Sequence, residues 1–245
     1  MRRLRDVLLV AALVAVLGAA AAVVLHHPAG GSSFVAPAGP AATAPSVTES
    51  ASADAAATSS TPTGPQSPGA GPVQTIATGD QITAGDSSWY ALTVKADAKL
   101  SSLGNVAAAD ITTHDLLANF GNDVLTKHPQ LVVIMGGSAD AAKKLALPTT
   151  IANLRMMIKA ATDAGAKVAL CTVPPRNSVP VFPLNTELRK LASASGAILL
   201  DLHDSVSTPA GVWVPADTSD GVTPNAAGAQ EMAKVAASAL AKAGF

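Results

Sequence analysis

Short apolar runs alternate with helix-forming stretches from residue 73 to residue 245. The runs are rich in Val, Ile and Leu and are bounded by turn residues, which is typical of buried parallel strands. They span residues 73–78, 131–135, 167–173 and 197–201, and the helix-forming stretches span residues 113–120, 149–164, 185–195 and 224–243. Gly165 is placed to end the second of these helices, and Pro224 suits the first turn of the last one. The alternation predicts one three-layer α/β/α domain with a parallel sheet over residues 73–245.

Residues 1–27 predict an export signal or a signal anchor. Arg2, Arg3 and Arg5 precede an uncharged apolar run over residues 7–25. As a helix this run would extend ~28 Å, close to the roughly 30 Å hydrocarbon core of a bilayer. Its length favours an uncleaved anchor, whereas the small residues at 19–22 suit cleavage, so both interpretations stay open. The arginines keep the N-terminal end in the cytoplasm, and we expect an extracytoplasmic domain that is membrane-anchored or secreted.

Residues 28–72 consist almost entirely of Ala, Pro, Ser, Thr and Gly, with Glu49 and Asp54 as their only charged side chains. Such a sequence buries too little apolar surface to offset the entropy lost on ordering. We expect a disordered linker that holds the domain away from the membrane surface.

The composition excludes several classes of binding site. A formal net charge of -1, with 13% charged residues, offers no basic surface for nucleic acid. The single cysteine, Cys171, rules out an intramolecular disulfide and a cysteine metal cluster, and its apolar surroundings predict a buried strand residue. The histidines of the domain include no pair at helical spacing. We therefore expect no metal and no cofactor.

Four short blocks of the predicted domain stand out by their order and spacing. They read GDQIT at residues 79–83, NVAAADITT at 105–113, GGSAD at 136–140 and DGVTP at 220–224. They resemble the motifs of the SGNH (GDSL-like) hydrolases, which run Gly-Asp-Ser, Asn-x-x-x-x-Gly-x-Thr, Gly-x-Asn-Asp and Asp-x-x-His. The resemblance covers residues 73–245 and implies an esterase fold of the SGNH-hydrolase type, which is a flavodoxin-like α/β fold.

The resemblance also implies a role for each block. The nucleophilic Ser of the family corresponds to Gln81 and the catalytic His to Thr223, while the Asp of the triad is retained as Asp220. The Gly amide and the Asn side chain that hold the oxyanion correspond to Asp110 and Ala139.

The blocks also fit one place in the predicted sheet. Three of them follow a predicted strand or precede the last helix, and ligands of a parallel sheet bind outside the carboxyl ends of its strands. We therefore expect a ligand crevice lined by Asp80, Gln81, Asp110, Ala139, Asp220 and Thr223.

The substitutions in these blocks predict that no catalytic residue remains. Gln81 offers no nucleophile, and Thr223 cannot take up a proton near neutral pH. Ala139 lacks the side-chain donor whose removal elsewhere lowers the rate by roughly 10²–10³. Asp110 places a carboxylate beside the spot where negative charge would develop.

Our leading hypothesis is a catalytically inactive SGNH-hydrolase-like domain that binds envelope carbohydrate or an acylated ligand in the former substrate crevice. The residues on either side of the substituted positions keep the family pattern. This favours either a domain that has retained a binding role or a sequence in which the catalytic residues were replaced deliberately. One alternative is an active esterase that works through Ser87 and His203; another is an envelope scaffold that binds nothing. Outside the esterase alternative, we expect Ser87 or Asp86 to cap a helix and His203 to be an ordinary surface or strand-end histidine.

Overall fold

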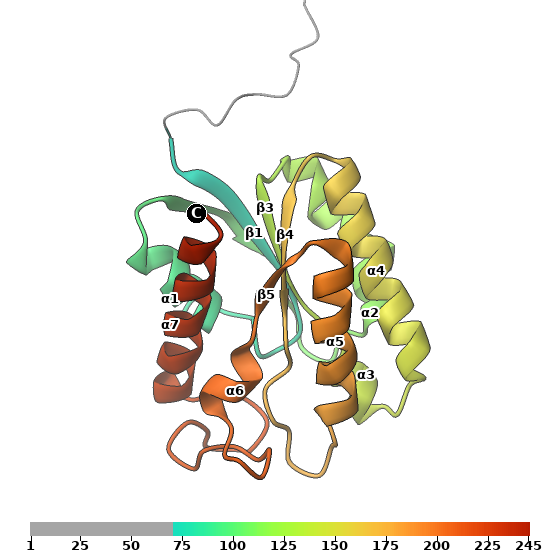
Figure 1. Cartoon of the computed structure of the whole chain (residues 1–245), viewed down its shortest axis with the longest axis vertical. Coiled ribbons are helices and arrows are strands. Elements are labelled where there is room, and N and C mark those ends of the chain that lie inside the picture. The colour runs from blue at the N-terminus through green and yellow to red at the C-terminus, as the bar shows by residue number, and fades with distance from the viewer. Residues whose placement is uncertain (1–70) are drawn as a thin grey trace, which may run out of the picture. The chain divides into compact units, whose positions relative to one another are not determined.

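The computed structural model describes residues 71–245 (Figure 1). The predicted N-terminal signal and residues 28–70 of the predicted linker lie outside the described residues. Five parallel strands form one sheet. In their order across the sheet they are β2 (Leu100–Asn105), β1 (Val73–Gly79), β3 (Leu131–Met135), β4 (Lys167–Cys171) and β5 (Ile198–Leu200). This order is that of a flavodoxin-like fold, so the predicted fold class is confirmed.

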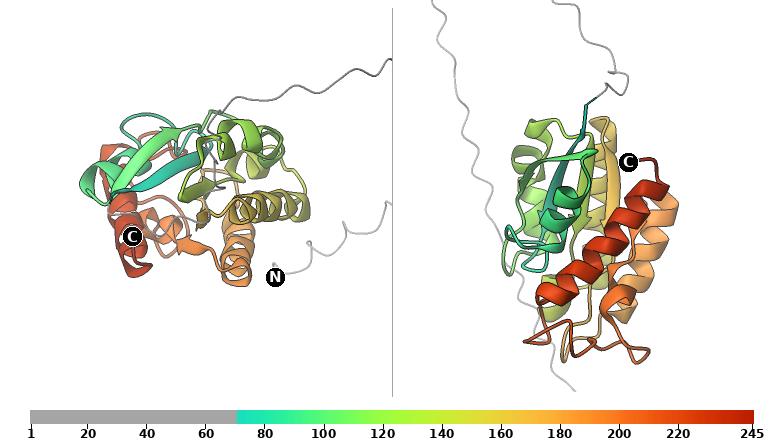
Figure 2. Two further views of the ribbon diagram at one scale, coloured as in Figure 1. Left: turned by 90° about the horizontal axis from the view of Figure 1, so that it is seen from above. Right: turned by 90° about the vertical axis from the view of Figure 1, so that its left-hand side faces the viewer.

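Helices cover both faces of the sheet (Figures 1 and 2). The helices are α1 (Trp89–Ala96), α2 (Thr113–Asp123), α3 (Ser138–Ala142), α4 (Leu147–Asp163), α5 (Phe182–Ser195), α6 (Leu202–Val206) and α7 (Ala226–Lys242). Helices α1 and α7 pack together on one face, and α2, α4 and α5 form the layer on the other. Within residues 71–245, no helix has the length and apolar character needed to cross a bilayer.

The core forms where the strands are apolar on both sides. Every residue of β3 is buried, and Cys171 at the end of β4 is fully buried, as predicted. Strand β2 was not predicted, because its sequence, LSSLGN, is polar and has one fully buried side chain, that of Leu100. It forms as an edge strand, paired to β1 through a register shift between Thr75 and Ile76.

Two helices begin at residues other than those predicted. In both cases the side chain that caps the helix identifies where it begins. Helix α1 begins after Ser88, whose hydroxyl accepts the Ala91 N–H, and not after Ser87 or Asp86. Pro224 lies before the cap of α7: the Asn225 side chain accepts the N–H groups of residues 227 and 228.

All four sequence blocks lie beyond the carboxyl ends of the strands, at the lower edge of the sheet in Figure 1. Strands β1 and β3 are neighbours but their connections run in opposite directions, so they form the switch point at which ligands of this fold class bind. The first block follows β1 and the third follows β3. The topology therefore places the blocks around one crevice.

Candidate functional site

The turn after β1 brings the backbone very close to β3. A Cβ atom on Gly79 would collide with the Met135 carbonyl oxygen, so the turn requires glycine. Asp80 follows and is 1% exposed. The Ile82 N–H donates to its Oδ1 at 3.1 Å, whereas Oδ2 has no hydrogen-bond partner within residues 71–245.

Burial sets the protonation behaviour of Asp80. It raises the pKa of the carboxyl to about 6, although the Ile82 N–H, the neighbouring Ser138 hydroxyl and the Arg176 guanidinium each lower it in part. The Arg176 guanidinium is held beside this carboxyl because its Nη1 donates to Ser138 Oγ at 3.1 Å. Asp80 is thus a buried acid at the floor of the switch point.

The second block begins at the last residue of β2. The Asn105 side chain donates to the Thr83 carbonyl at 2.6 Å and so ties this block to the first. Five residues on, Asp110 adopts φ 55°, in the left-handed region that favours glycine. The family has glycine at the corresponding place, and aspartate is among the residues that tolerate this conformation.

The side chain of Gln81 reaches across to the second block. Its Oε1 accepts the backbone N–H of Asp110 at 3.2 Å. Lys143, at the end of α3, donates from Nζ to the Asp110 carbonyl at 2.7 Å. The Asp110 amide, the expected oxyanion donor, is therefore bonded to the side chain that stands at the expected nucleophile position.

Asp140, in the third block, joins three elements through its buried carboxylate. It accepts the Thr113 N–H at 2.9 Å and the Thr113 hydroxyl at 2.5 Å, at the start of α2. It also accepts the Thr150 hydroxyl at 3.0 Å, from α4. Asn153 donates to the Thr113 hydroxyl at 3.1 Å. This buried network fixes α2, α3 and α4 relative to one another around the crevice.

Both carboxylate oxygens of Asp220, in the fourth block, accept hydrogen bonds from residues of the same loop. Its Oδ1 accepts the N–H groups of Val222 at 2.8 Å and Thr223 at 2.7 Å, and its Oδ2 accepts the Thr223 hydroxyl at 2.8 Å. These bonds lower its pKa to about 2. Asp220 is therefore ionised at neutral pH and shapes the loop.

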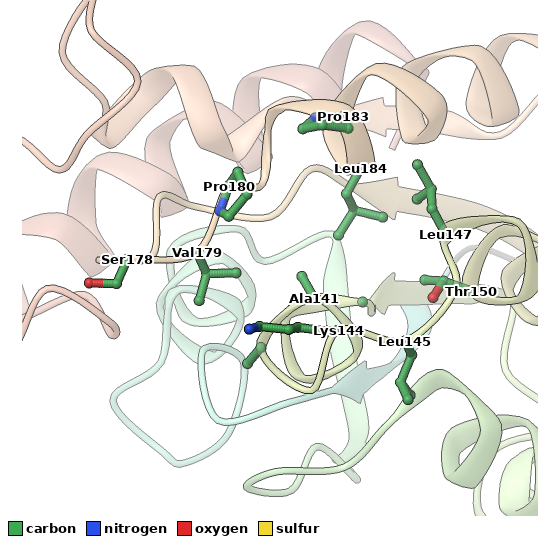
Figure 3. Close-up of a pocket in the computed structure, with 12 residues that line it drawn as sticks. Ala141, Lys144, Leu145, Leu147, Thr150, Ser178, Val179, Pro180, Pro183 and Leu184 are labelled. Atoms are coloured by element: carbon green, nitrogen blue, oxygen red, sulfur yellow. The ribbon is translucent and has the colours of Figure 1, made fainter. Parts of the chain in front are cut away.

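Two cavities flank the blocks. One of them, of about 340 Å³, is lined by Gln81 and Thr223 together with Ser87, which is exposed. An apolar one of about 440 Å³ lies between the segments that follow β3 and β4 (Figure 3). Its walls include Leu145, Leu147, Val179, Pro180, Pro183 and Leu184. Within residues 71–245, no group of three or more His, Cys, Asp or Glu side chains is arranged to hold a metal ion.

The structure brings some of the predicted crevice residues together and buries others. Gln81 lies beside both Asp110 and Thr223, and Thr223 contacts Asp220. Asp80 and Ala139 do not form part of the exposed lining, because they are 1% and 2% exposed and lie beneath the crevice surface.

Ser87 and His203 line different cavities, so the cavity that contains Ser87 has no histidine in its lining. His203 does follow strand β5, as expected, but it lies in α6 and is buried.

Sequence reasoning missed two cations near the site, Lys143 and Arg176. Each is next to a recognised block, Lys143 three residues after the third and Arg176 shortly after β4. Their positions near strand ends were visible in the sequence, whereas their partners, the Asp110 carbonyl and the Ser138 hydroxyl, depend on tertiary folding.

Solved structures share this fold. A GDSL-like lipase from Bacteroides thetaiotaomicron VPI-5482 has 24% identity and a TM-score of 0.61, over 69% of this chain and 88% of that one. An acetylxylan esterase from Geobacillus stearothermophilus has 19% identity and a TM-score of 0.58, over 69% of this chain and 95% of that one. An α/β hydrolase enzyme from the metagenome of Lake Arreo, Spain, has 18% identity and a TM-score of 0.61, over 70% and 96%.

A search of curated protein sequences gives no match. The model of the GDSL-like Lipase/Acylhydrolase family matches residues 77–231, which contain all four blocks. That range is more than half of the chain and agrees with the fold and with the place of the blocks at the switch point. The chain therefore belongs to the GDSL-like lipase/acylhydrolase family.

Proposed function

We propose that this domain is a catalytically inactive family member that binds an acylated ligand in the former substrate crevice. The observation that carries the proposal is the bond from the Asp110 N–H to Gln81 Oε1. The Gln81 side-chain carbonyl accepts the N–H group that an ester oxyanion would need as its hydrogen-bond donor. The same side chain stands at the position that corresponds to the family's nucleophile.

The remaining partners at this site supply no replacement chemistry. Acyl transfer needs a nucleophile with a base within hydrogen-bond reach. The Thr223 hydroxyl donates to Asp220, so it is engaged as a donor and offers no base. The esterase alternative depends on the Ser87 hydroxyl, which lies in the lining of the cavity of about 340 Å³. His203, the base in that alternative, lines another cavity.

The apolar cavity next to the crevice residues favours an acyl chain over a carbohydrate as the ligand. Its lining is dominated by aliphatic and proline side chains and contains no aromatic ring on which a sugar could stack. Its volume of about 440 Å³ lies within the usual range for small-molecule sites. Figure 3 shows Lys144 at this cavity, where its ammonium group suits an anionic head group.

We further propose, from residues 1–27 alone, that the domain acts outside the cytoplasm, tethered or secreted. A fusion of residues 1–72 to alkaline phosphatase, which folds only after export, tests this. Activity equal to that of a fusion without residues 1–27 would refute it.

The experiment on the crevice combines reactivity and binding. The purified protein is expected to turn over neither p-nitrophenyl acetate nor butyrate above a denatured control, and to resist labelling by a fluorophosphonate probe. It is expected to bind cis-parinaric acid, followed by fluorescence. Val179→Trp fills the apolar cavity and should weaken that binding by about tenfold or more, whereas Met156→Trp, on an exposed face of α4, should not.

Two other outcomes of this experiment would favour the alternatives. Turnover or labelling that disappears in Ser87→Ala would establish the esterase alternative. A protein that is neither reactive nor able to bind the fatty acid would support the scaffold alternative and refute the proposal.

A further inference from the structure

A third cavity, of about 460 Å³, lies between the start of α5 and the segment that follows α6. Its lining includes Phe182, Arg189, His203, Asp204 and Ser207. It shares no lining residue with the two cavities that flank the sequence blocks. It therefore offers a site separate from the crevice.

The imidazole of His203 is fixed at this cavity. Its side chain is 9% exposed, and its Nδ1 lies 2.9 Å from Asp204 Oδ1 and 3.4 Å from Ser207 Oγ. The backbone N–H of the same residue donates to the Thr172 hydroxyl at 2.9 Å. Because an ionised carboxylate only accepts, the bond to Asp204 places a proton on Nδ1. The hydrogen bonds of the ring within residues 71–245 are made by Nδ1, so Nε2 is available to a ligand.

The arrangement differs from a catalytic triad. Asp204 and Ser207 approach the same ring nitrogen, so Ser207 does not stand where His203 could activate it. The ring nitrogen that remains can accept a hydrogen bond from a ligand hydroxyl.

Arg189 is held rigidly at the same cavity. Its Nε and Nη2 donate to the two oxygens of Asp201 at 2.7 and 2.9 Å, and Nη2 also donates to Asp204 Oδ1 at 3.1 Å. Arg189 is therefore shared by two carboxylates, those of Asp201 and Asp204, and the lining has no unpaired cation for an anionic ligand. The exposed Asp204 carboxylate can accept hydrogen bonds from ligand hydroxyl groups, so the lining suits an uncharged ligand rich in hydroxyls better than an anion.

Phe182 provides an exposed ring at the wall of this cavity. Its exposure is 72%, whereas Trp89, Tyr90 and Trp213 are each at most 5% exposed. A flat ring next to fixed hydrogen-bonding groups matches the two sides of a sugar, whose C–H faces are apolar and whose edges carry hydroxyls.

We infer that this cavity binds a neutral saccharide. A ligand hydroxyl donates to His203 Nε2, Arg189 donates to a ligand oxygen through N–H groups not used by Asp201, and the Phe182 ring stacks on a sugar face. Arg189 and His203 are already held by their partners, so binding orders few side chains. The site is independent of the proposed crevice function.

The test titrates the full-length protein with xylotriose, cellotriose and chitotriose by isothermal titration calorimetry and saturation-transfer NMR. At least one trisaccharide is expected to bind with a dissociation constant below about 10 mM. Phe182→Ala should weaken binding by up to about tenfold, the effect of losing an aromatic partner. Met156→Ala, which removes a comparably exposed apolar side chain elsewhere, should leave it unchanged.

His203→Phe removes the ring nitrogens and should abolish the binding. Should that variant fail to fold, Asp204→Asn at an exposed position provides a second test, because it alters the hydrogen bond that fixes the imidazole. Absence of binding by all three trisaccharides, unchanged affinity in Phe182→Ala, or binding of choline in their place overturns the inference. Val179→Trp should leave trisaccharide binding unchanged, and Phe182→Ala should leave parinaric acid binding unchanged. The two proposals can therefore be refuted independently of each other.

Discussion

Thr223 donates its hydroxyl hydrogen to Asp220 Oδ2 across 2.8 Å, in the loop that leads into α7. An imidazole at position 223 would stand within reach of the same carboxylate. Asp220 is ionised at neutral pH, because hydrogen bonds from its loop lower its pKa to about 2. On the proposed assignment, Asp220 would be the orienting member of a triad, and Thr223 would stand at the position of the base.

This relationship predicts how activity can be restored. Gln81→Ser alone should give almost no esterase activity, because a serine without a base is a poor nucleophile. Adding Thr223→His should raise p-nitrophenyl acetate turnover by more than the product of the single effects, because triad members act as a unit. Asp110→Gly and Ala139→Asn should then each raise the turnover rate by a further ~10²-fold through the oxyanion donors.

The controls for this restoration follow from burial. Ala139 is 2% exposed, so the Asn variant must be checked for folding by circular dichroism before its rate is interpreted. A folded quadruple variant no more active than the starting protein would refute the assignment of the four positions.

The backbone at Asp110 predicts a stabilising substitution. Its φ of 55° is costly for residues with a Cβ atom, so Asp110→Gly should raise the free energy of unfolding by about 0.5–1 kcal/mol. The bond from Lys143 should persist, since it ends on the backbone carbonyl. Urea unfolding measures the change, and Asp110→Ala, which keeps a Cβ atom, should destabilise the domain.

Burial of Asp80 predicts a stability that falls as the pH rises. Its pKa is about 6 in the folded domain against an ordinary value of 3.8, so the folded state keeps a proton that the unfolded chain has lost between pH 4 and 6. At about 1.4 kcal/mol per pKa unit, the free energy of unfolding loses on the order of 3 kcal/mol across this window. Asp80→Asn should remove that loss, measured by urea unfolding at pH 4 to 7. The exposed Asp86→Asn in the same loop is the matched control, and equal profiles for Asp80→Asn and the wild type would contradict the account.

The fragment 73–245 is expected to fold without the preceding residues. Its sheet, both helical layers and core lie within residues 73–245. Circular dichroism should show helical and strand signal with a cooperative thermal transition. An unfolded fragment beside a folded full-length chain would show that earlier residues are required.

The elements that were predicted best are those whose structure is determined by their own residues. Strand β3 matches its predicted range, since five consecutive apolar residues between polar turns have few other solutions. Strand β2 escaped prediction because its pairing with β1, and not its own hydrophobicity, holds it. The start of α7 was misplaced because Pro224 fits a first turn as well as the position before an Asn cap.

The candidate site was predictable in position but not in contacts. Strand ends and block spacing located Gln81, Asp110, Asp220 and Thr223 at one edge of the sheet. The bond between Gln81 and Asp110, and the burial of Asp80, depend on side chains from segments far apart in the sequence. The cavity at His203 has no sequence signature, because its residues come from two helices and the segment after them.

The carboxylate of Asp140 makes the framework of the crevice independent of the residues at its rim. Its bonds to Thr113 and Thr150 hold three helices in place, and neither partner stands at an expected chemical position. Point substitutions at Gln81 or Thr223 therefore leave this network intact. The side chains at the rim of the crevice can therefore change while α2, α3 and α4 keep their places beneath it.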